Sequence, residues 1–413
     1  MSDGGLRGYL IRNARWLSAG TLLTFLSCFG QTFFISVFAG EIRGEFGLSH
    51  GGWGGLYSIA TAASAVVMIW SGVLTDWFRV RALGPAVLLG LSAACLAMAW
   101  NTWIMMLPVV IFGLRLFGQG MSTHIALVAM ARWFQVTRGR ALAIATLGFS
   151  FGEALLPLSF VSAMKVVGWR DLWLVCAFVC IAGIPVLMSL LRHERTPHSL
   201  AESDTSTGMN NHHWTRREAL SHPLFWFIVP SVLGPSAFVT ATFFHQVHLA
   251  EVKGWEHLTF VAMFPVFTGL AIVTAIATGV ALDKWGTARM MPLFQIPMIL
   301  GFLVFASGSG VGMLLLGFML LALTVGANST LPSAFCAEFY GTAHIGAIKA
   351  LATAVMVLGS AIGPVLTGVL IDAGIGMETQ FLWFSAYFLM ACGLVWLGIN
   401  RVQIPPRDRR RYT

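Results

Sequence analysis

The stretch Gly72-Val-Leu-Thr-Asp76-Trp-Phe-Arg79-Val-Arg81 is a short charged segment that directly follows a long apolar run. A second version follows another apolar run and reads Gly279-Val-Ala-Leu-Asp283-Lys284-Trp-Gly286-Thr-Ala-Arg289. The two glycines lie 279 − 72 = 207 positions apart, which is about half of the 413 residues. A repeat at that distance predicts two halves built to one plan.

The composition excludes a protein whose surface faces mainly water. Of the 413 residues, 57% are hydrophobic and only 10% are charged, and the mean hydropathy is +0.78. A soluble domain carries about 25% charged residues. At the lower charge density most of the exterior must face lipid, so the composition predicts an integral membrane protein with several spans.

The formal net charge of +8 does not indicate a nucleic-acid partner. The basic residues lie between apolar runs and at both ends, without an aromatic-rich basic face. The basic tail from Arg407 to Arg411 is expected to lie near anionic lipid headgroups. The six cysteines all fall in apolar segments and are interpreted as small buried hydrophobic residues.

Sequence patterns of enzymes and cofactor sites are missing from the chain. It contains no nucleotide-binding Gly-x-x-x-x-Gly-Lys loop, no zinc-ligand spacing and no nucleophile elbow. We therefore expect no enzymatic activity, no cofactor and no metal site.

Twelve apolar runs are candidates for membrane spans, each of which needs about 20 mostly apolar residues. Six runs precede a polar stretch from Arg192 to Arg217, and six follow it. The predicted organisation is an N-terminal six-helix bundle over 1–191, a linker over 192–220 and a C-terminal six-helix bundle over 221–413. The predicted spans are 17–39, 53–75, 83–101, 104–133, 139–165, 171–191, 222–248, 257–282, 290–308, 311–337, 345–371 and 380–399.

The first run is too long for the hydrophobic part of a signal peptide, so we expect it to be a retained span. The positions of Lys and Arg then predict the orientation. With the N-terminus inside, twenty of them fall on cytoplasmic segments, four fall outside, and Arg115 lies within a span. This distribution predicts a cytoplasmic linker and two cytoplasmic termini in a cell (inner) membrane. The four outside are Arg43, Lys165, Arg170 and Lys253.

The two halves also repeat a pattern of small residues. The predicted fifth span contains Gly148 and Gly152, and the predicted eleventh contains Gly359 and Gly363. The offset between the first glycines is 359 − 148 = 211, close to the offset of the charged segments. Small residues four apart let a neighbouring helix approach closely, so we expect tight helix contacts at both places.

The duplicated charged segment resembles the loop between the second and third helices in each half of a major facilitator superfamily transporter. The resemblance covers nearly the whole chain. It implies an all-α membrane fold with twelve transmembrane helices in two pseudo-symmetric six-helix bundles, a small-molecule substrate and transport by alternating access. It also implies that the charged segments are gating elements. Their residues are Gly72, Asp76, Arg79 and Arg81, and Gly279, Asp283, Lys284, Gly286 and Arg289.

Within that superfamily the chain is most similar to the monocarboxylate and oxalate/formate transporter group. The residues that show this similarity begin with Ala131-Arg132-Trp133-Phe134 and continue with Arg138-Gly-Arg140-Ala-Leu-Ala, Gly148, Gly152, Pro157 and Gly168-Trp169-Arg170. A second string is Glu338-Phe-Tyr-Gly341, followed by Gly363-Pro364 and Gly368-Val-Leu-Ile-Asp372. Members of this group often carry an Arg deep in the eighth span, whereas this chain has no charge there before Asp283.

Two charges, Arg115 and Glu153, are predicted to lie deep in the membrane. Charges at that depth cost several kcal/mol unless paired or hydrated, so both are functional candidates. Counting from the turn near Val136, their depths differ by only about 6 Å at 1.5 Å per residue. A salt bridge between them is therefore feasible. In the functional hypothesis Glu153 takes up a proton and releases Arg115 to bind an anion; the alternative is a static pair that joins two spans.

Further candidates for the substrate or proton pathway are polar residues in apolar runs. His245 and His248 are predicted near the outer end of the seventh span, where imidazole can bind a carboxylate or relay a proton. His124 in the fourth span is a weaker candidate, because a histidine packed between helices explains it better. Gln31 and Asn328 are candidates for hydrogen bonds to a substrate, or simply to a neighbouring helix.

The leading hypothesis is a monomeric, proton-coupled importer of a small organic anion. The alternative is a proton-coupled antiporter that exports a drug, vitamin or other metabolite. Such antiporters usually have a Gly-Pro-rich fifth span, whereas here the Gly-Pro pair, Gly363-Pro364, falls in the eleventh. A non-transporting sensor on the same fold is a third possibility, which the short linker and termini disfavour.

Overall fold

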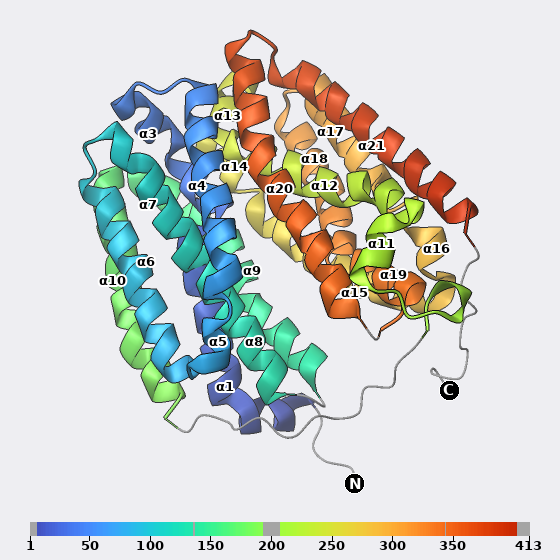
Figure 1. The fold of residues 1–413 in the computed structure, drawn as a ribbon. Helices are drawn as coiled ribbons and strands as arrows, with labels where there is room; N and C mark the ends of the chain where they lie inside the picture. Colours follow the sequence, from blue (N-terminus) through green and yellow to red (C-terminus); the bar gives the residue numbers. More distant parts are fainter. Residues whose placement is uncertain (1–5, 135–136, 193–206, 343, 403–413) are drawn as a thin grey trace. The chain divides into compact units, whose positions relative to one another are not determined.

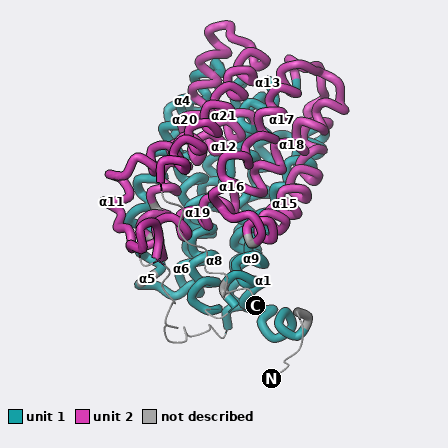
Figure 2. Tube along the Cα trace, turned by 90° about the vertical axis from the view of Figure 1, so that its right-hand side faces the viewer, with its two compact units in different colours: residues 1–202, 243–250 teal, residues 203–242, 251–413 magenta. Residues whose placement is uncertain are grey.

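The computed structural model describes residues 6–134, 137–192, 207–342 and 344–402, and every regular element within these ranges is a helix (Figure 1). The chain divides into two compact units (Figure 2). Unit 1 comprises 1–202 together with 243–250, and unit 2 comprises 203–242 and 251–413.

The helices before the central polar stretch all belong to unit 1. Residues 243–250, which also belong to unit 1, are the last two residues of α12 and the first part of α13. The elements are α1 (Leu6–Leu26), η1 (Ser27–Gly30), α2 (Thr32–Ile35), η2 (Ser36–Phe38), α3 (Ala39–Phe46), α4 (His50–Ser71), α5 (Leu74–Trp77), α6 (Val80–Trp100), η3 (Ile104–Met106), α7 (Leu107–Gly113), η4 (Leu114–Ser122), α8 (Thr123–Trp133), α9 (Arg138–Met164) and α10 (Trp169–Leu190).

The later helices belong to unit 2, apart from the short stretch just named. They are η5 (Met209–Asn211), α11 (Arg216–Ser221), α12 (Pro223–Phe244), α13 (Gln246–Lys253), α14 (His257–Val261), α15 (Phe264–Trp285), α16 (Thr287–Met290), α17 (Ile296–Ser307), α18 (Val311–Asn328), α19 (Leu331–Tyr340), α20 (Ile345–Asp372) and α21 (Met377–Asn400).

The apolar runs of the sequence form twelve helical segments in the predicted order. Ten of the segments that the structure describes are long and apolar enough to cross a membrane. An eleventh is the bent pair Gly8–Gly30 and Thr32–Phe46, and α17, with 12 residues, occupies the position of the ninth. The predicted all-α membrane fold is therefore confirmed.

The first span is broken, although the sequence predicts one continuous run over 17–39. Gln31 has an extended backbone (φ −86°, ψ 151°), and the axes on either side differ by 47°. Just before the break, a Cβ on Gly30 would overlap the carbonyl oxygen of Leu114 in η4. The backbones of the first and fourth spans thus touch at a residue that has no side chain, directly where the first helix ends.

The fourth span also departs from a regular α-helix. Its central part, η4, is a nine-residue π-helix. Segments of π-helix are rare and often mark functional sites. In unit 2 the tenth span is interrupted at the corresponding place, because α18 ends at Asn328 and α19 begins at Leu331.

The predicted close helix contacts are confirmed in both units. A Cβ on Gly148 would overlap the carbonyl oxygen of Thr21 in α1, and one on Gly152 would overlap the thiol of Cys28. In unit 2 a Cβ on Gly363 would overlap the carbonyl oxygen of Ala237 in α12. The fifth span therefore packs on the first as the eleventh packs on the seventh, and backbone touches backbone in each pair.

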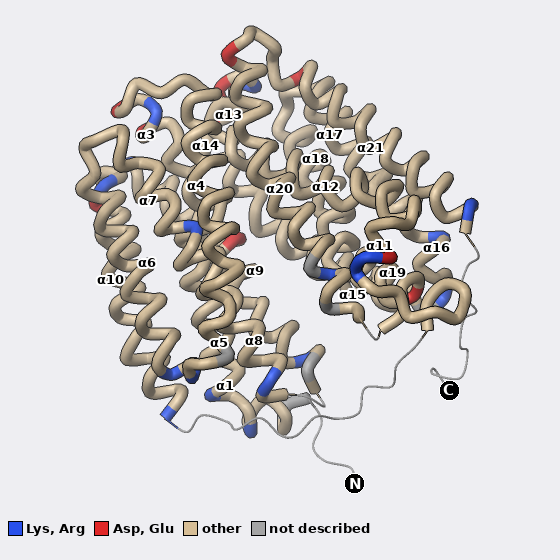
Figure 3. Tube along the Cα trace, viewed as in Figure 1, with Lys and Arg blue, Asp and Glu red and all other residues tan. Residues whose placement is uncertain are grey.

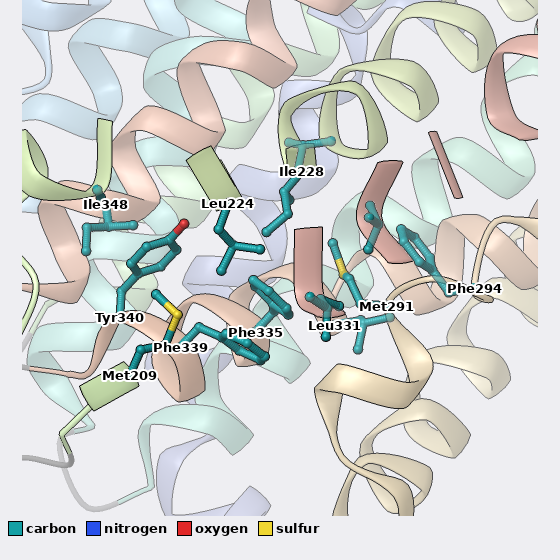
Figure 4. Close-up of a cluster of buried hydrophobic side chains, with 14 of the residues drawn as sticks. Met209, Leu224, Ile228, Met291, Phe294, Leu331, Phe335, Phe339, Tyr340 and Ile348 are labelled. Carbon is teal, nitrogen blue, oxygen red and sulfur yellow. The ribbon is translucent and has the colours of Figure 1, made fainter. Parts of the chain in front are cut away.

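Unit 2 has a hydrophobic core near the point where the chain enters it (Figure 4). Met209 lies beside Tyr340 and Phe339, and all three are almost fully buried. Phe335 and Phe339 stack with ring centroids 4.1 Å apart. Of the predicted linker 192–220, the structure describes residue 192 and residues 207–220, and the later part packs into this core through Met209.

Helix α11 begins with a reciprocal cap. The Oγ1 of Thr215 accepts from the backbone N–H of Glu218, and the backbone N–H of Thr215 donates to the Glu218 carboxylate at 2.7 Å. Hydrogen bonds from the Thr215 backbone and hydroxyl hold the pKa of Glu218 below its usual value. Capping of this kind satisfies N–H groups that the first helical turn leaves free.

Replacing the contact glycines should destabilise each unit. Gly148→Ala and Gly363→Ala force a methyl group into a neighbouring backbone, an overpacking that typically costs about 1–3 kcal/mol. We expect a lower melting temperature and less monodisperse protein in detergent for both. Gly393→Ala is the matched control, because its Cβ would meet nothing within 4 Å. If Gly148→Ala melts like the wild type, the close contact is not formed in the protein.

Candidate functional site

Charged residues gather near the ends of the helices, and few lie in their middle parts (Figure 3). Arg115 and Glu153 are exceptions within unit 1, at positions inside the spans Ile104–Trp133 and Gly139–Met164. The surroundings of these two residues therefore indicate what unit 1 can bind.

Arg115 lies at the start of η4 and is only 1% exposed. Its Nη1 donates to the carbonyl oxygen of Gly30 at 3.1 Å and to the hydroxyl of Thr32 at 3.3 Å. These two acceptors stand on either side of the break at Gln31. The guanidinium therefore binds the two ends of the broken first span to the fourth span.

An aromatic ring of the second span completes this arrangement. The guanidinium carbon of Arg115 lies 5.3 Å from the ring centroid of Tyr57, within the range of a cation–π interaction. The Tyr57 hydroxyl is 2.6 Å from the Thr32 hydroxyl, and either oxygen can be the donor. We call Gly30, Gln31, Thr32, Tyr57 and Arg115 the broken-span site.

The positive charge of this site has no negative partner in the described part of the chain. Arg115 forms no ion pair there, and its Nε is buried without a hydrogen-bond partner. A buried charge normally demands a counter-ion or several hydrogen bonds. The site therefore holds a buried positive charge with one unused donor, the Nε–H.

Glu153 does not form the predicted salt bridge with Arg115. It is half-buried on α9 and acts electrostatically on the thiol of Cys28, which belongs to η1. The two charges thus approach the same short helix, Arg115 at Gly30 and Glu153 at Cys28. Counting residues gave their depth but not their direction around the helix axis, and the π-helix at Arg115 changes that direction relative to an α-helix.

The predicted histidine candidates lie elsewhere in unit 1. The ring of His50 is 4.2 Å from that of His248 and 5.9 Å from that of His245, centroid to centroid. These three rings form a cluster between the start of α4 and the 243–250 segment. His124 is not in the broken-span site either, because its Nε2 lies 3.3 Å from the carbonyl oxygen of Gly72.

Of the two uncharged candidates, Gln31 is in the broken-span site and Asn328 is in unit 2. Gln31 is the extended residue at the break and is 9% exposed. Asn328 is the last residue of α18, and its Oδ1 is buried without a hydrogen-bond partner among the described residues. Each lies where a membrane-spanning helix is interrupted.

The first charged segment is braced by the fourth span. His124 contacts Gly72, and Nη1 of Arg132 donates to the carbonyl oxygen of Thr75 at 2.5 Å. Arg79 and Arg81 are exposed, and Arg81 donates to the carbonyl oxygen of Arg192. The side chain of Asp76 lies outside the described part of the structure.

The second charged segment is braced by the tenth span. Gly286 has φ +78°, a conformation that favours glycine, and it ends α15. The next residue, Thr287, donates through its hydroxyl (2.7 Å) and its N–H (3.3 Å) to the carboxylate of Glu338. Among the other predicted gating residues, Lys284 and Arg289 are exposed, and a Cβ on Gly279 would meet nothing within 4 Å; the side chain of Asp283 lies outside the described part.

The two braces occupy equivalent positions of the repeat. Arg132 and Glu338 lie 338 − 132 = 206 residues apart, almost the offset of the charged segments themselves. Each reaches the turn after the second span of its own half. The halves thus repeat a contact as well as a sequence, although the charge of the bracing residue is reversed.

Comparison with known proteins decides the family. The family model of the Major Facilitator Superfamily matches residues 20–311 and 266–411. The chain belongs to this superfamily. It is therefore a multi-pass membrane transporter. Membership of a transporter superfamily argues against an enzymatic function.

Individual relatives of this superfamily member are distant. It is 24% identical to a gentisate transporter of Corynebacterium glutamicum over an alignment of 377 residues. The alignment covers 84% of this chain and 79% of the relative. Two solved structures share the fold. A bacterial homologue of the human lysosomal transporter Spinster has a TM-score of 0.69 and 16% identity, with 94% of this chain and 97% of that one covered. The nucleoside transporter NupG has a TM-score of 0.71 and 14% identity, with 94% and 100% covered.

Sequence reasoning missed five residues of these sites: Gly30, Thr32, Tyr57, Arg132 and Glu338. Thr32 and Tyr57 are ordinary residues of apolar spans, and nothing in their local sequence marks them. Arg132 and Glu338 lie in the two strings that carry the family resemblance, so their 206-residue offset was a usable signal. Only the coordinates show what they contact.

Removing the second brace should destabilise unit 2. Glu338→Ala leaves the buried hydroxyl and N–H of Thr287 without their acceptor, which costs about 1–3 kcal/mol. We expect a lower melting temperature in detergent. The control is Glu256→Ala, which removes an exposed carboxylate of the same unit. Equal melting temperatures of the two variants would contradict the brace.

Proposed function

We propose that this transporter carries a small organic anion whose carboxylate binds Arg115 in the broken-span site. The observation that carries the proposal is a buried guanidinium with no carboxylate partner and an unused Nε–H. A guanidinium offers parallel N–H groups that match the two oxygens of a carboxylate. An incoming carboxylate would supply the charge that the described residues do not.

The surroundings of Arg115 favour an anion that also has an apolar or aromatic body. Tyr57 places its ring beside the guanidinium, and the hydroxyl of Thr32 accepts a hydrogen bond from it. Membrane transporters commonly bind substrates where a helix is interrupted, because free backbone groups are available there. The gentisate transporter among the relatives handles an aromatic carboxylate, which supports this substrate class.

We propose Glu153 as the proton-carrying residue. It is a half-buried carboxylate inside a span, and intramembrane carboxylates commonly serve proton transfer. An anion on Arg115 and an ionised Glu153 would be like charges near the same short helix, η1. Protonation of Glu153 would remove that repulsion, so anion and proton would enter together without the direct ion pair first considered.

The setting that we propose follows the distribution of charge. Twenty of the 25 Lys and Arg residues fall on segments assigned to the cytoplasm. On this basis we propose that both termini lie on the cytoplasmic side of a cell (inner) membrane, and that the protein acts as a monomer. Membership of the monocarboxylate and oxalate/formate group is part of the same proposal, supported by the two sequence strings.

Export of a metabolite in exchange for protons remains the competing mechanism, and the direction of the gradient separates the two. In proteoliposomes, a symporter accumulates substrate when the outside is acidic. An antiporter accumulates it when the inside is acidic. Uptake of labelled gentisate, benzoate and smaller carboxylates, with glucose and a nucleoside as uncharged comparisons, tests both substrate class and direction.

Arg115→Gln should weaken binding of the carboxylate that the wild type takes up. Losing a charge-assisted hydrogen bond costs about 1.5–3 kcal/mol, which is about 10- to 150-fold in Kd. Arg115→Lys should recover only part of the affinity, because lysine has no planar pair of donors. Lys165→Gln, which removes an exposed cation at the end of α9, is the control. Wild-type affinity in a folded Arg115→Gln protein would refute the proposal.

Glu153→Gln should separate anion movement from proton movement. Glutamine has nearly the same shape but cannot carry a proton, so the pH-gradient-driven accumulation should be lost. Exchange of labelled for unlabelled substrate should continue at a rate within a few-fold of the wild type. Both activities are measured in the same proteoliposomes, with and without a protonophore. A Glu153→Gln variant that still responds to the pH gradient would exclude this residue as the carrier.

A further inference from the structure

Gln246 is a fully buried residue of unit 1 that the proposed function does not use. It is the first residue of α13, and only His245 separates it from the end of α12. Its Nε2 donates to the hydroxyl of Ser36 at 2.7 Å and to the carbonyl oxygen of Phe33 at 3.2 Å. The side chain thus attaches the 243–250 segment to the part of the first span that follows the break.

Ser36 extends this contact toward Arg115. Its hydroxyl accepts from Gln246 and donates to the carbonyl oxygen of Thr32 at 2.7 Å. The hydroxyl of Thr32 in turn accepts from Arg115. Hydrogen bonds therefore connect Gln246 through Ser36 to the backbone carbonyl of Thr32, and a separate bond connects the hydroxyl of the same residue to the guanidinium. We call this series of contacts the relay.

An aromatic contact runs beside the polar relay. Phe244, two residues before Gln246, stacks on Trp53 with centroids 5.4 Å apart and an interplanar angle of 17°. The Phe244 ring is also 4.6 Å from the ring of Tyr57, on which Arg115 rests. A polar and an aromatic route thus connect the 243–250 segment with Arg115, and the hydroxyls of Thr32 and Tyr57 join the two routes.

We infer that Gln246 is a positioning residue for the anion site. By holding Ser36 and hence Thr32, it fixes the part of the broken span that orients Arg115. Because linkage is reciprocal, an anion on Arg115 must then change the attachment of the 243–250 segment to the first span. This segment continues at residue 242 into α12 of unit 2, so the relay transmits occupancy of the site to the chain that leaves unit 1. The inference rests on the proposed function.

Hydrogen exchange in the absence of ligand tests the relay directly. Gln246→Leu and Ser36→Ala should speed amide exchange in Thr32–Phe38, and also in η4 around Arg115, by about 2- to 12-fold, the range for one lost hydrogen bond. Gln380→Leu is the matched control. Gln380 is likewise fully buried and donates to two carbonyl oxygens, but in unit 2. Faster exchange near residue 36 alone, with η4 unchanged, would overturn the inference.

Binding of labelled gentisate gives the second readout. Gln246→Leu and Ser36→Ala should each weaken binding by a similar factor, and the double variant should be no worse than either, because they interrupt one relay. Gln380→Leu should lower the melting temperature and leave Kd unchanged. Additive losses in the double variant would contradict the relay. Ser36→Ala is the milder change and decides the question if Gln246→Leu does not fold.

The Arg115→Gln variant separates this inference from the proposed function. If Arg115→Gln binds carboxylates normally, the proposed function fails, while the exchange measurement still decides whether the relay exists. If Arg115→Gln loses binding but Gln246→Leu binds and exchanges like the wild type, the relay alone is refuted.

Discussion

The burial of one guanidinium is the constraint on which the first unit depends. Arg115 stands inside a span, and a charge there costs several kcal/mol unless its donors are used. The structure uses Nη1 by breaking the first span, so that a carbonyl oxygen and a hydroxyl on the two sides of the break face it. The Nε–H has no acceptor among the described residues. In the proposed function, an anionic substrate accepts a hydrogen bond from it.

The same site explains why three spans of unit 1 are irregular or closely packed together. Gly30 lets the backbone of the first span contact the fourth span at the break of the first span. Arg115 lies at this contact because it belongs to the π-helix η4. On the opposite side, Gly152 brings α9 against Cys28, and Glu153 is the next residue. A glycine thus lies near Arg115 and another near Glu153, and the close approach of backbones at these glycines brings both side chains to one short helix.

The repeat gives the two units similar contacts but different chemistry. Glycines of the fifth and eleventh spans press on the first and seventh, and the fourth and tenth spans brace the following charged turns. Yet unit 1 carries the buried cation, whereas the described interruption in unit 2 presents Asn328 and a hydrophobic core. Duplication therefore accounts for the scaffold, and the differences between the halves account for the presence of a buried cation in unit 1.

Much of the fold follows from the sequence, because the transfer of an apolar run into lipid is decided within each segment. The predicted span 257–282 coincides with His257–Leu282, and the Gly148 and Gly363 contacts were expected from spacing alone. The partners of Arg115 were not. Thr32 and Gly30 lie 83 and 85 residues away, and the break that exposes them arises from contact between two spans. Local sequence sets which segments enter the membrane; the tertiary packing decides which way their polar side chains face and what they hold.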